Sequence, residues 1–329
     1  MSFSIRTREA QAGDRSGTVY ELIGDSARAE VWPMCGFNCL RWSINNQPIL
    51  FTMPDWETNP VPTRSGHPIL FPFPGRLRDG KLPANGKTFQ LPLNDSTKQH
   101  AIHGFTPRNV WRVAATVAEA NHASISGTFD LPNDLPNAVG SWPSDFVLTV
   151  TYTLRADRLG VEATVWNRGA EPLPFGLGYH PYFRLPGVTD ADVGGHVLQA
   201  NVNKVWTADE ANLPTGVLKD VPAEIDFRSP RPIGSTALDY VLTDVTTTGT
   251  MREMAVLSHP ASPGRLRFLA DESFRELVLF VPAHRQAVAI EPYTCSADAS
   301  NLAARGLSTG WRGLQPGEEW FGRVEYVYG

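Results

Sequence analysis

Five polar residues lie in unusually apolar or aromatic surroundings in this sequence. Glu291 ends the apolar run AVAIE, and Arg76 follows the proline-broken run HPILFPFPG. His103 lies in AIHGF, His180 in PFGLGYHPYF and Asp239 in ALDYV. A charged group at the end of a buried apolar strand is unfavourable unless it forms an ion pair or takes part in the protein's function. We therefore treat these five residues as candidate functional residues.

The residue types favour acid/base chemistry and binding of a polyhydroxylated ligand. A carboxylate and an imidazole have unperturbed pKa values of about 4.3 and 6.5, which suit them to accept and donate protons near neutrality. Aromatic rings beside polar groups suit sugars, because rings pack against C–H faces while hydroxyls require hydrogen bonds. The sequence has no GxGxxG, no Walker loop, no GxSxG and no HExxH motif. We therefore expect no cofactor and no metal.

Each candidate also has a structural explanation. A single histidine such as His103 or His180 is commonly a hydrogen-bonded structural residue. Glu291 and Arg76 could form a buried structural ion pair, and Asp239 could cap a turn. A metal site formed by His100, His103, His180 and Glu291 is a further alternative.

Strand-like alternation dominates the elements that must position these residues. Alternate apolar residues in 146–154 and again in 161–165 flank the turn-like RADRLG, which predicts a β-hairpin. Similar runs occupy residues 265–270, 276–281, 287–291 and 320–328. No segment of a dozen residues shows a helical stripe. The sequence therefore predicts an all-β fold, a large antiparallel β-sandwich, with residues 1–329 as a single domain.

Composition excludes several classes of protein. The 329 residues include 29 Lys+Arg and 34 Asp+Glu, a net charge of −5, and no basic run, so we expect no nucleic-acid partner. No stretch approaches the 18 apolar residues of a membrane span, so we expect no membrane association. Three cysteines are too few for a disulfide framework, which favours a reducing, cytoplasmic location. We expect a monomer or a homodimer.

The order of the motifs makes the functional expectation more specific. FPFPGRL, HGF, GYHPYF, then VW…LPTG…DF…LDYV, and finally EPYT…DASN follow one another from about Gly66 to the C-terminus. In this order they resemble the aldose 1-epimerase (galactose mutarotase) family. The resemblance implies a supersandwich fold and a sugar substrate whose α- and β-anomers are interconverted. Two positions depart from the family pattern: His67, where relatives carry a small or apolar residue, and HGF in place of HGG.

The resemblance also implies a role for each candidate. Glu291 matches the family's general base and His180 its general acid. His103 matches the second histidine near the ring oxygen, and Arg76 and Asp239 match residues that bind sugar hydroxyls. The catalytic set would be Glu291, His180 and His103, without a metal.

Three other functions remain open from the sequence. A hexose-6-phosphate mutarotase could use Arg64, Arg78 and Arg108 as a phosphate clamp. A non-catalytic carbohydrate-binding protein could use the same fold, although it would not need an acid/base pair. A glycoside hydrolase or lyase would need a second carboxylate in a matching motif, and the sequence has none.

Overall fold

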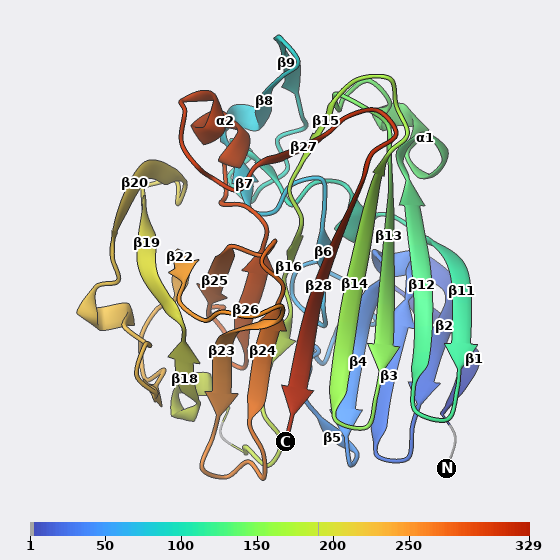
Figure 1. Ribbon diagram of the computed structural model, residues 1–329. Helices are drawn as coiled ribbons and strands as arrows, with labels where there is room; N and C mark the ends of the chain where they lie inside the picture. Colours follow the sequence, from blue (N-terminus) through green and yellow to red (C-terminus); the bar gives the residue numbers. More distant parts are fainter. Residues whose placement is uncertain (1–2, 190) are drawn as a thin grey trace.

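The computed structural model describes residues 3–189 and 191–329, and strands dominate it (Figure 1). The described strands form three large sheets and three two-stranded ones, and neighbouring strands in the large sheets are antiparallel. The α-helices of this part of the chain are two short ones, α1 (Leu131–Asp134) and α2 (Ala299–Ala304). The predicted all-β, antiparallel fold is therefore confirmed. No described helix has both the length and the apolar character needed to cross a bilayer.

The largest sheet contains the hairpin that alternation predicts. Its Phe146, Leu148 and Val150 side chains are fully buried, while the residues between them are half-buried. In spatial order the nine strands are β11 (Arg112–Ala118), β12 (Ala123–Asp130), β13 (Phe146–Leu154), β14 (Arg158–Asn167), β28 (Glu319–Tyr328), β24 (Leu266–Ala270), β23 (Arg252–Ser258), β18 (Val197–Ala200) and β21 (Arg231–Pro232). The predicted runs 265–270 and 320–328 thus become β24 and β28.

An N-terminal sheet lies behind β11–β14 in Figure 1, drawn in blue. Its strands follow chain order: β1 (Ser4–Ala12), β2 (Arg15–Ile23), β3 (Ala27–Trp32), β4 (Asn38–Ile44) and β5 (Gln47–Pro48). Apolar side chains of this sheet, such as Val31 and Trp42, join those of β13 in one continuous core. The two sheets therefore bury a common apolar layer, as expected of a sandwich.

The third large sheet carries most of the candidate residues. Its strands are β20 (Pro214–Asp220), β19 (Val202–Ala208), β22 (Asp239–Val245), β25 (Glu276–Phe280), β26 (Val288–Tyr293), β16 (Gly178–Tyr179) and β6 (Ile69–Leu70), and β17 (Tyr182–Phe183) also pairs with β26. The smaller pairs are β7 (Arg76–Leu77) with β10 (Ala101–Ile102), β8 (Lys81–Ala84) with β9 (Lys87–Gln90), and β15 (Leu173–Phe175) with β27 (Arg312–Leu314).

The two faces of this third sheet differ in character. Leu277, Leu279 and Ile290 point into the main apolar core. Because strand side chains alternate, Val278 and Glu291 point the opposite way, and they stand opposite each other in the β25–β26 ladder. This second face, away from the core, is where the candidate chemistry is located.

Candidate functional site

All five candidate residues line one cavity of about 210 Å³. Arg76 begins β7 and His103 directly follows β10. His180 follows β16, Asp239 begins β22, and Glu291 lies in β26. The structure therefore brings together residues that are more than 200 positions apart in the sequence. The other lining residues are Thr63, Gly75, Ile102, Tyr182, Asn212, Val241, Val278, Phe280, Tyr293 and Ala297.

Glu291 and His180 are in direct contact at the centre of this cavity. His180 Nε2 lies 3.4 Å from Glu291 Oε1, and both side chains are at least nine-tenths buried. The second carboxyl oxygen of Glu291 accepts a hydrogen bond of 2.6 Å from the Tyr293 hydroxyl. Since Tyr293 lies two residues after Glu291 in the same strand, both side chains project from the same face.

Burial shifts the pKa values of this pair in opposite directions. Loss of hydration raises the pKa of Glu291 well above its usual value, and the hydrogen bond from Tyr293 offsets part of that rise. The same loss of hydration lowers the pKa of His180 to about 3. Both shifts favour the uncharged forms. The two groups together therefore hold one proton over a wide pH range, and their contact provides a path for exchanging it.

Tyr182 supports the His180 ring. The two rings stack with centroids 4.8 Å apart, and the Tyr182 hydroxyl lies 3.4 Å from His180 Nε2. That hydroxyl donates its proton to the Thr63 carbonyl at 2.5 Å. Its oxygen therefore has only lone pairs left for His180, so it can accept but not donate there.

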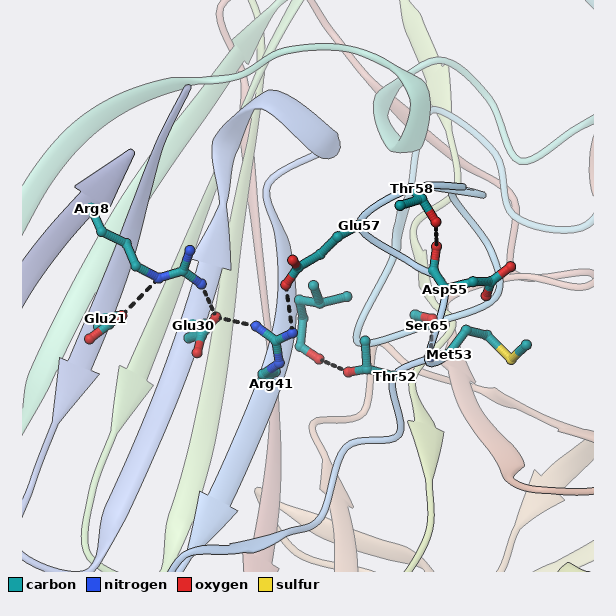
Figure 2. A network of polar contacts seen from close by, with 11 residues as sticks. Arg8, Glu21, Glu30, Arg41, Thr52, Met53, Asp55, Glu57, Thr58 and Ser65 are labelled. Atoms are coloured by element: carbon teal, nitrogen blue, oxygen red, sulfur yellow. Dashed lines mark hydrogen bonds and ion pairs between the residues drawn. The ribbon is translucent and has the colours of Figure 1, made fainter. Parts of the chain in front are cut away.

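The loop that supplies Thr63 is tied to the N-terminal sheet by polar contacts, which Figure 2 shows. Arg41 donates to Glu57, and the Thr52 hydroxyl donates to the Leu40 carbonyl. Within the loop, the Met53 backbone N–H donates to the Ser65 hydroxyl oxygen. The loop wall of the cavity is therefore braced against strand β4.

His103 is held by a two-way backbone contact. Its N–H donates to the Gly75 carbonyl at 2.9 Å, and the Gly75 N–H donates to His103 Nδ1 at 3.2 Å. The residue has a φ of +64°, a left-handed conformation uncommon for non-glycine residues. Because Nδ1 accepts a hydrogen bond, the neutral ring carries its hydrogen on Nε2. Burial, with the nearby His180 and Arg76, keeps the pKa of His103 well below its usual value.

The position of Arg76 excludes the structural ion pair considered from the sequence. Its ion pair is with Asp95, at 3.9 Å, whereas Glu291 contacts His180 and Tyr293. Burial alone would raise the pKa of Asp95, but hydrogen bonds from Thr97 and from backbone N–H groups outweigh it and lower the pKa to about 2. Asp95 is thus a carboxylate that holds Arg76 at the cavity wall.

Asp239 lies at the exposed mouth of the cavity. Asn212 donates to Asp239 Oδ2 at 2.6 Å. Asn212 belongs to a tight turn that is stabilised by the Asp209 carboxylate, which accepts the backbone N–H groups of Ala211 and Leu213. Arg78 in turn pairs with Asp209 at 2.6 Å. The sequence did not single out Asn212, because nothing in its local context distinguishes it from any other turn residue.

The arginines proposed as a phosphate clamp do not converge on the cavity. Arg78 is committed to Asp209 and to the buried Asp298. None of Arg64, Arg78 and Arg108 is among the lining residues, and only Arg64 follows one of them, Thr63, in the chain. The clamp of three arginines is therefore not formed.

His67 and His100 have structural positions. His67, which departs from the family pattern, is fully buried between the Tyr152 and Tyr326 hydroxyls, and burial lowers its pKa to about 3. His100 accepts the Asp79 N–H through Nδ1 and does not line the cavity. Within residues 3–189 and 191–329, no three His, Cys, Asp or Glu side chains are grouped to hold one metal ion. All three cysteines are buried free thiols.

The sequence contained a signal for two supporting residues that it did not identify. Tyr182 and Tyr293 each lie two positions after a candidate residue, His180 and Glu291. Period-2 alternation places Glu291 and Tyr293 on the same face of β26, whereas His180 lies between β16 and β17 and only its spacing of two from Tyr182 is the same. A larger hollow of about 520 Å³ adjoins the outer face of β3 and β4, but none of the five candidate residues lines it.

A family model and curated proteins relate this chain to aldose 1-epimerases. The family model described as aldose 1-epimerase matches residues 36–327. An uncharacterized Escherichia coli protein, YihR, is 27% identical over 234 residues, covering 71% of each chain. Mouse galactose mutarotase is 25% identical over 169 residues, covering 50% of this chain and 46% of its own.

Solved structures share the fold over the whole chain. A galactose mutarotase-like protein from Clostridium acetobutylicum superposes with a TM-score of 0.88 at 22% identity, covering 100% of this chain and 99% of its own. Galactose 1-epimerase from Lactobacillus acidophilus gives a TM-score of 0.79 at 19% identity, covering 99% of both chains. The expected galactose mutarotase-like fold is confirmed by these superpositions.

Proposed function

Because the chain belongs to the aldose 1-epimerase family, we propose that it interconverts the α- and β-anomers of a hexose or a related aldose. The observation that carries this proposal is the contact between Glu291 and His180 inside a cavity of about 210 Å³. That volume suits one sugar ring and is below the roughly 300–1,000 Å³ of pockets for drug-sized ligands.

The reaction needs two proton transfers and no oxidant or reductant. Glu291 takes the proton of the C1 hydroxyl, the C1–O5 bond breaks, and O5 receives a proton from His180. The open-chain aldehyde rotates about the C1–C2 bond. Ring closure on the other face of the carbonyl then returns both protons to their donors. Each transfer by a positioned side chain contributes roughly 10²–10⁴-fold.

The opposed pKa shifts support these roles. A raised pKa makes the Glu291 carboxylate a stronger base, and a lowered pKa makes protonated His180 a stronger acid. The state with Glu291 ionised and His180 protonated has the same number of protons as the uncharged pair. The substrate therefore only has to redistribute a proton that the site already holds.

The other three candidates fit binding roles. His103, with Nε2 free to donate, assists at the ring oxygen. Arg76 at the cavity wall and Asp239 at its mouth donate to and accept from sugar hydroxyls. A pure carbohydrate-binding protein would need these contacts but not the acid/base pair, which is why we favour the enzyme.

One observation favours a phosphorylated sugar as the second candidate substrate. Arg64 is exposed, follows the cavity residue Thr63, and is close enough to influence the pKa values of Tyr182 and His284. A 6-phosphate directed toward this loop would meet a cation there. Arg64 alone, rather than the three arginines considered from the sequence, would hold it.

Exchange between anomers measured by NMR saturation transfer tests the function directly. We would screen free hexoses, pentoses and hexose 6-phosphates with wild type, Glu291→Gln and His180→Asn. Both variants should bind sugar while turnover falls by about 10²-fold or more. Glu276→Gln is a matched control, because Glu276 is a fully buried carboxyl in the neighbouring strand that does not line the cavity.

Two outcomes would count against the proposal. If no aldose is anomerised faster than in buffer, the proposed activity is wrong. If Glu291→Gln melts at a lower temperature but stays active, Glu291 is a structural residue. The single domain, the cytoplasmic location and the monomeric or homodimeric state stay predictions from the sequence.

A further inference from the structure

A hollow of about 260 Å³ lies outside the catalytic cavity, and the two share no lining residue in the described part of the chain. Arg275, which directly precedes β25, and Arg312, which begins β27, form part of its wall. The end of α2 and the segment that joins α2 to β27 form the rest (Figure 1). The residues that this stretch contributes are Ala303, Leu307, Ser308, Thr309, Gly310 and Trp311. We call this site the arginine hollow.

The two arginines bring positive charge to the hollow without a carboxylate partner. Arg275 Nη1 donates to the Ser308 hydroxyl at 3.3 Å, and Arg312 Nη2 donates to the Ser273 carbonyl at 3.2 Å. Within residues 3–189 and 191–329, neither guanidinium forms an ion pair. Arg312 Nε is buried and has no hydrogen-bond partner in the same part of the chain. The hollow therefore contains charged donors that the protein itself does not satisfy.

The pKa of Arg312 reflects this missing counter-charge. Loss of hydration lowers the pKa, and repulsion by Arg275 adds to that effect, although Asp271 and Glu272 act in the opposite direction. Neither of these carboxyl groups lines the hollow, and the Asp271 carboxylate accepts two backbone N–H groups instead. An anion bound in the hollow would stabilise both guanidinium charges.

The segment after α2 adds neutral donors to the same hollow. Ser308, Thr309 and Gly310 line it, and their backbone N–H groups have no acceptor among the described residues. The Ser308 hydroxyl oxygen accepts from Arg275, which leaves the hydroxyl hydrogen available to a ligand. Guanidinium groups together with backbone N–H groups and a hydroxyl form a donor set that suits the oxygens of a phosphate group.

Buried contacts fix the position of this donor segment. Thr309 is buried, its hydroxyl donates to the Ala299 carbonyl at 3.1 Å, and its carbonyl accepts the Ser296 N–H at 3.0 Å. Gly310 has a φ of +79°, and a Cβ there would lie 2.3 Å from the Thr294 carbonyl oxygen, so the backbone path requires glycine. The donors are therefore held in place before a ligand arrives, which lowers the entropic cost of binding.

From these contacts we propose that the arginine hollow binds the phosphate group of a small phosphate monoester, and inorganic phosphate in the same way. Arg275 and Arg312 hold the phosphate oxygens, and Ser308 donates its hydroxyl hydrogen. Ala303 and Leu307 give the hollow an apolar side, where the carbon part of the ester packs. The volume of about 260 Å³ is below the roughly 300–1,000 Å³ of pockets for drug-sized ligands, so the ester is small. This site does not depend on the proposed exchange of anomers.

Titration calorimetry with inorganic phosphate, and separately with glycerol 2-phosphate, tests the site without any turnover. The proteins are wild type, Arg275→Gln, Arg275→Lys and the control Arg6→Gln, which changes an exposed arginine in β1. About 0.15 M sodium chloride shortens the Debye length to about 8 Å and so screens unspecific attraction. Arg275→Gln should weaken binding of both ligands about tenfold or more, as expected for a lost hydrogen bond to a charged group. Arg275→Lys keeps the charge but loses the planar fork, so its affinity should fall between those of wild type and Arg275→Gln.

Arg64→Ala separates this site from the catalytic cavity, because Arg64 follows the cavity residue Thr63 in the chain. This variant should bind both ligands as wild type does, and either ligand should raise the melting temperature of wild type. The site is overturned if wild type binds neither ligand, or if Arg64→Ala loses binding while Arg275→Gln keeps it. It is also overturned if Arg6→Gln weakens binding as much as Arg275→Gln. Glycerol 2-phosphate should bind at least as tightly as inorganic phosphate, and binding of inorganic phosphate alone would overturn the monoester as the ligand class.

Discussion

Removing the Tyr293 hydroxyl should move the pH dependence of catalysis without abolishing it. Tyr293→Phe deletes the 2.6 Å hydrogen bond to Glu291 Oε2 and leaves the ring in its place. This bond favours the charged carboxylate and so lowers the pKa of Glu291 against the effect of burial. A hydrogen bond to a charged group contributes about 1.5–3 kcal/mol. At 1.36 kcal/mol per pKa unit, its loss raises the pKa of Glu291 by about 1–2 units.

The sign of the effect on rate follows from the proposed role of Glu291. The active form has Glu291 ionised and His180 protonated, so the pair must hold one proton, and activity is lost as the pH rises through the raised pKa at which Glu291 gives that proton up. In Tyr293→Phe this alkaline limb moves to higher pH by about 1–2 units. Well below the limb, the rate is lower than in wild type, because loss of the hydrogen bond disfavours the ionised form of Glu291 within the pair.

The assay is kcat/KM from saturation transfer between anomers, measured from pH 4.5 to 9 and corrected for mutarotation in buffer. Tyr179→Phe is the matched control. Tyr179 lies in β16 next to His180, and its buried hydroxyl has no hydrogen-bond partner among the described residues. The control should leave both limb and plateau unchanged. An alkaline limb that stays in place, or moves to lower pH, in Tyr293→Phe would refute the assignment of the limb to Glu291.

Three further outcomes are expected. Arg76→Ala should impair turnover of every substrate, whereas Arg108→Ala should not. Arg64→Ala should lower turnover of a 6-phosphate only, and kcat/KM for a hexose and for its 6-phosphate checks this. The free energy of unfolding should fall as the pH rises from about 4.5 to 7, because burial raises the pKa of Glu276 to about 7. Glu276→Gln should remove about 3 kcal/mol of that loss, which denaturant unfolding at pH 5 and at pH 8 measures. Activity should survive a chelator, and its loss with recovery on adding zinc would revive a metal mechanism.

The strands were predictable because burial on one face imposes a period of two on the sequence. β13, β24, β25 and β28 each begin and end within a residue or two of the predicted runs. The same period relates Tyr293 to Glu291 within β26, so this supporting residue was predictable from the pattern. Alternation does not depend on distant parts of the chain, which is why it is readable locally.

Contacts between distant segments could not be read in this way. The Asn212 amide reaches Asp239 across 27 residues, and the Tyr182 hydroxyl reaches the Thr63 carbonyl across 119. His67 was recognisable as unusual, but only the packed core shows that two tyrosine hydroxyls account for it. Arg78 was available as a phosphate ligand until the structure showed its two aspartate partners. In each case the tertiary fold determines which residue becomes the hydrogen-bond or ion-pair partner.

The anchoring of the site has a consequence for how its specificity can evolve. Glu291 lies within a central strand, and His180 follows a short strand paired beside it, so any shift of either would disturb a sheet buried on its other face. Asn212 and Arg64, by contrast, lie in connecting segments that tolerate replacement and insertion. Mutations in those segments can retune which sugar is accepted while the proton-transfer geometry is inherited unchanged. Substrate selectivity can therefore change by mutation without changes to the residues that transfer protons.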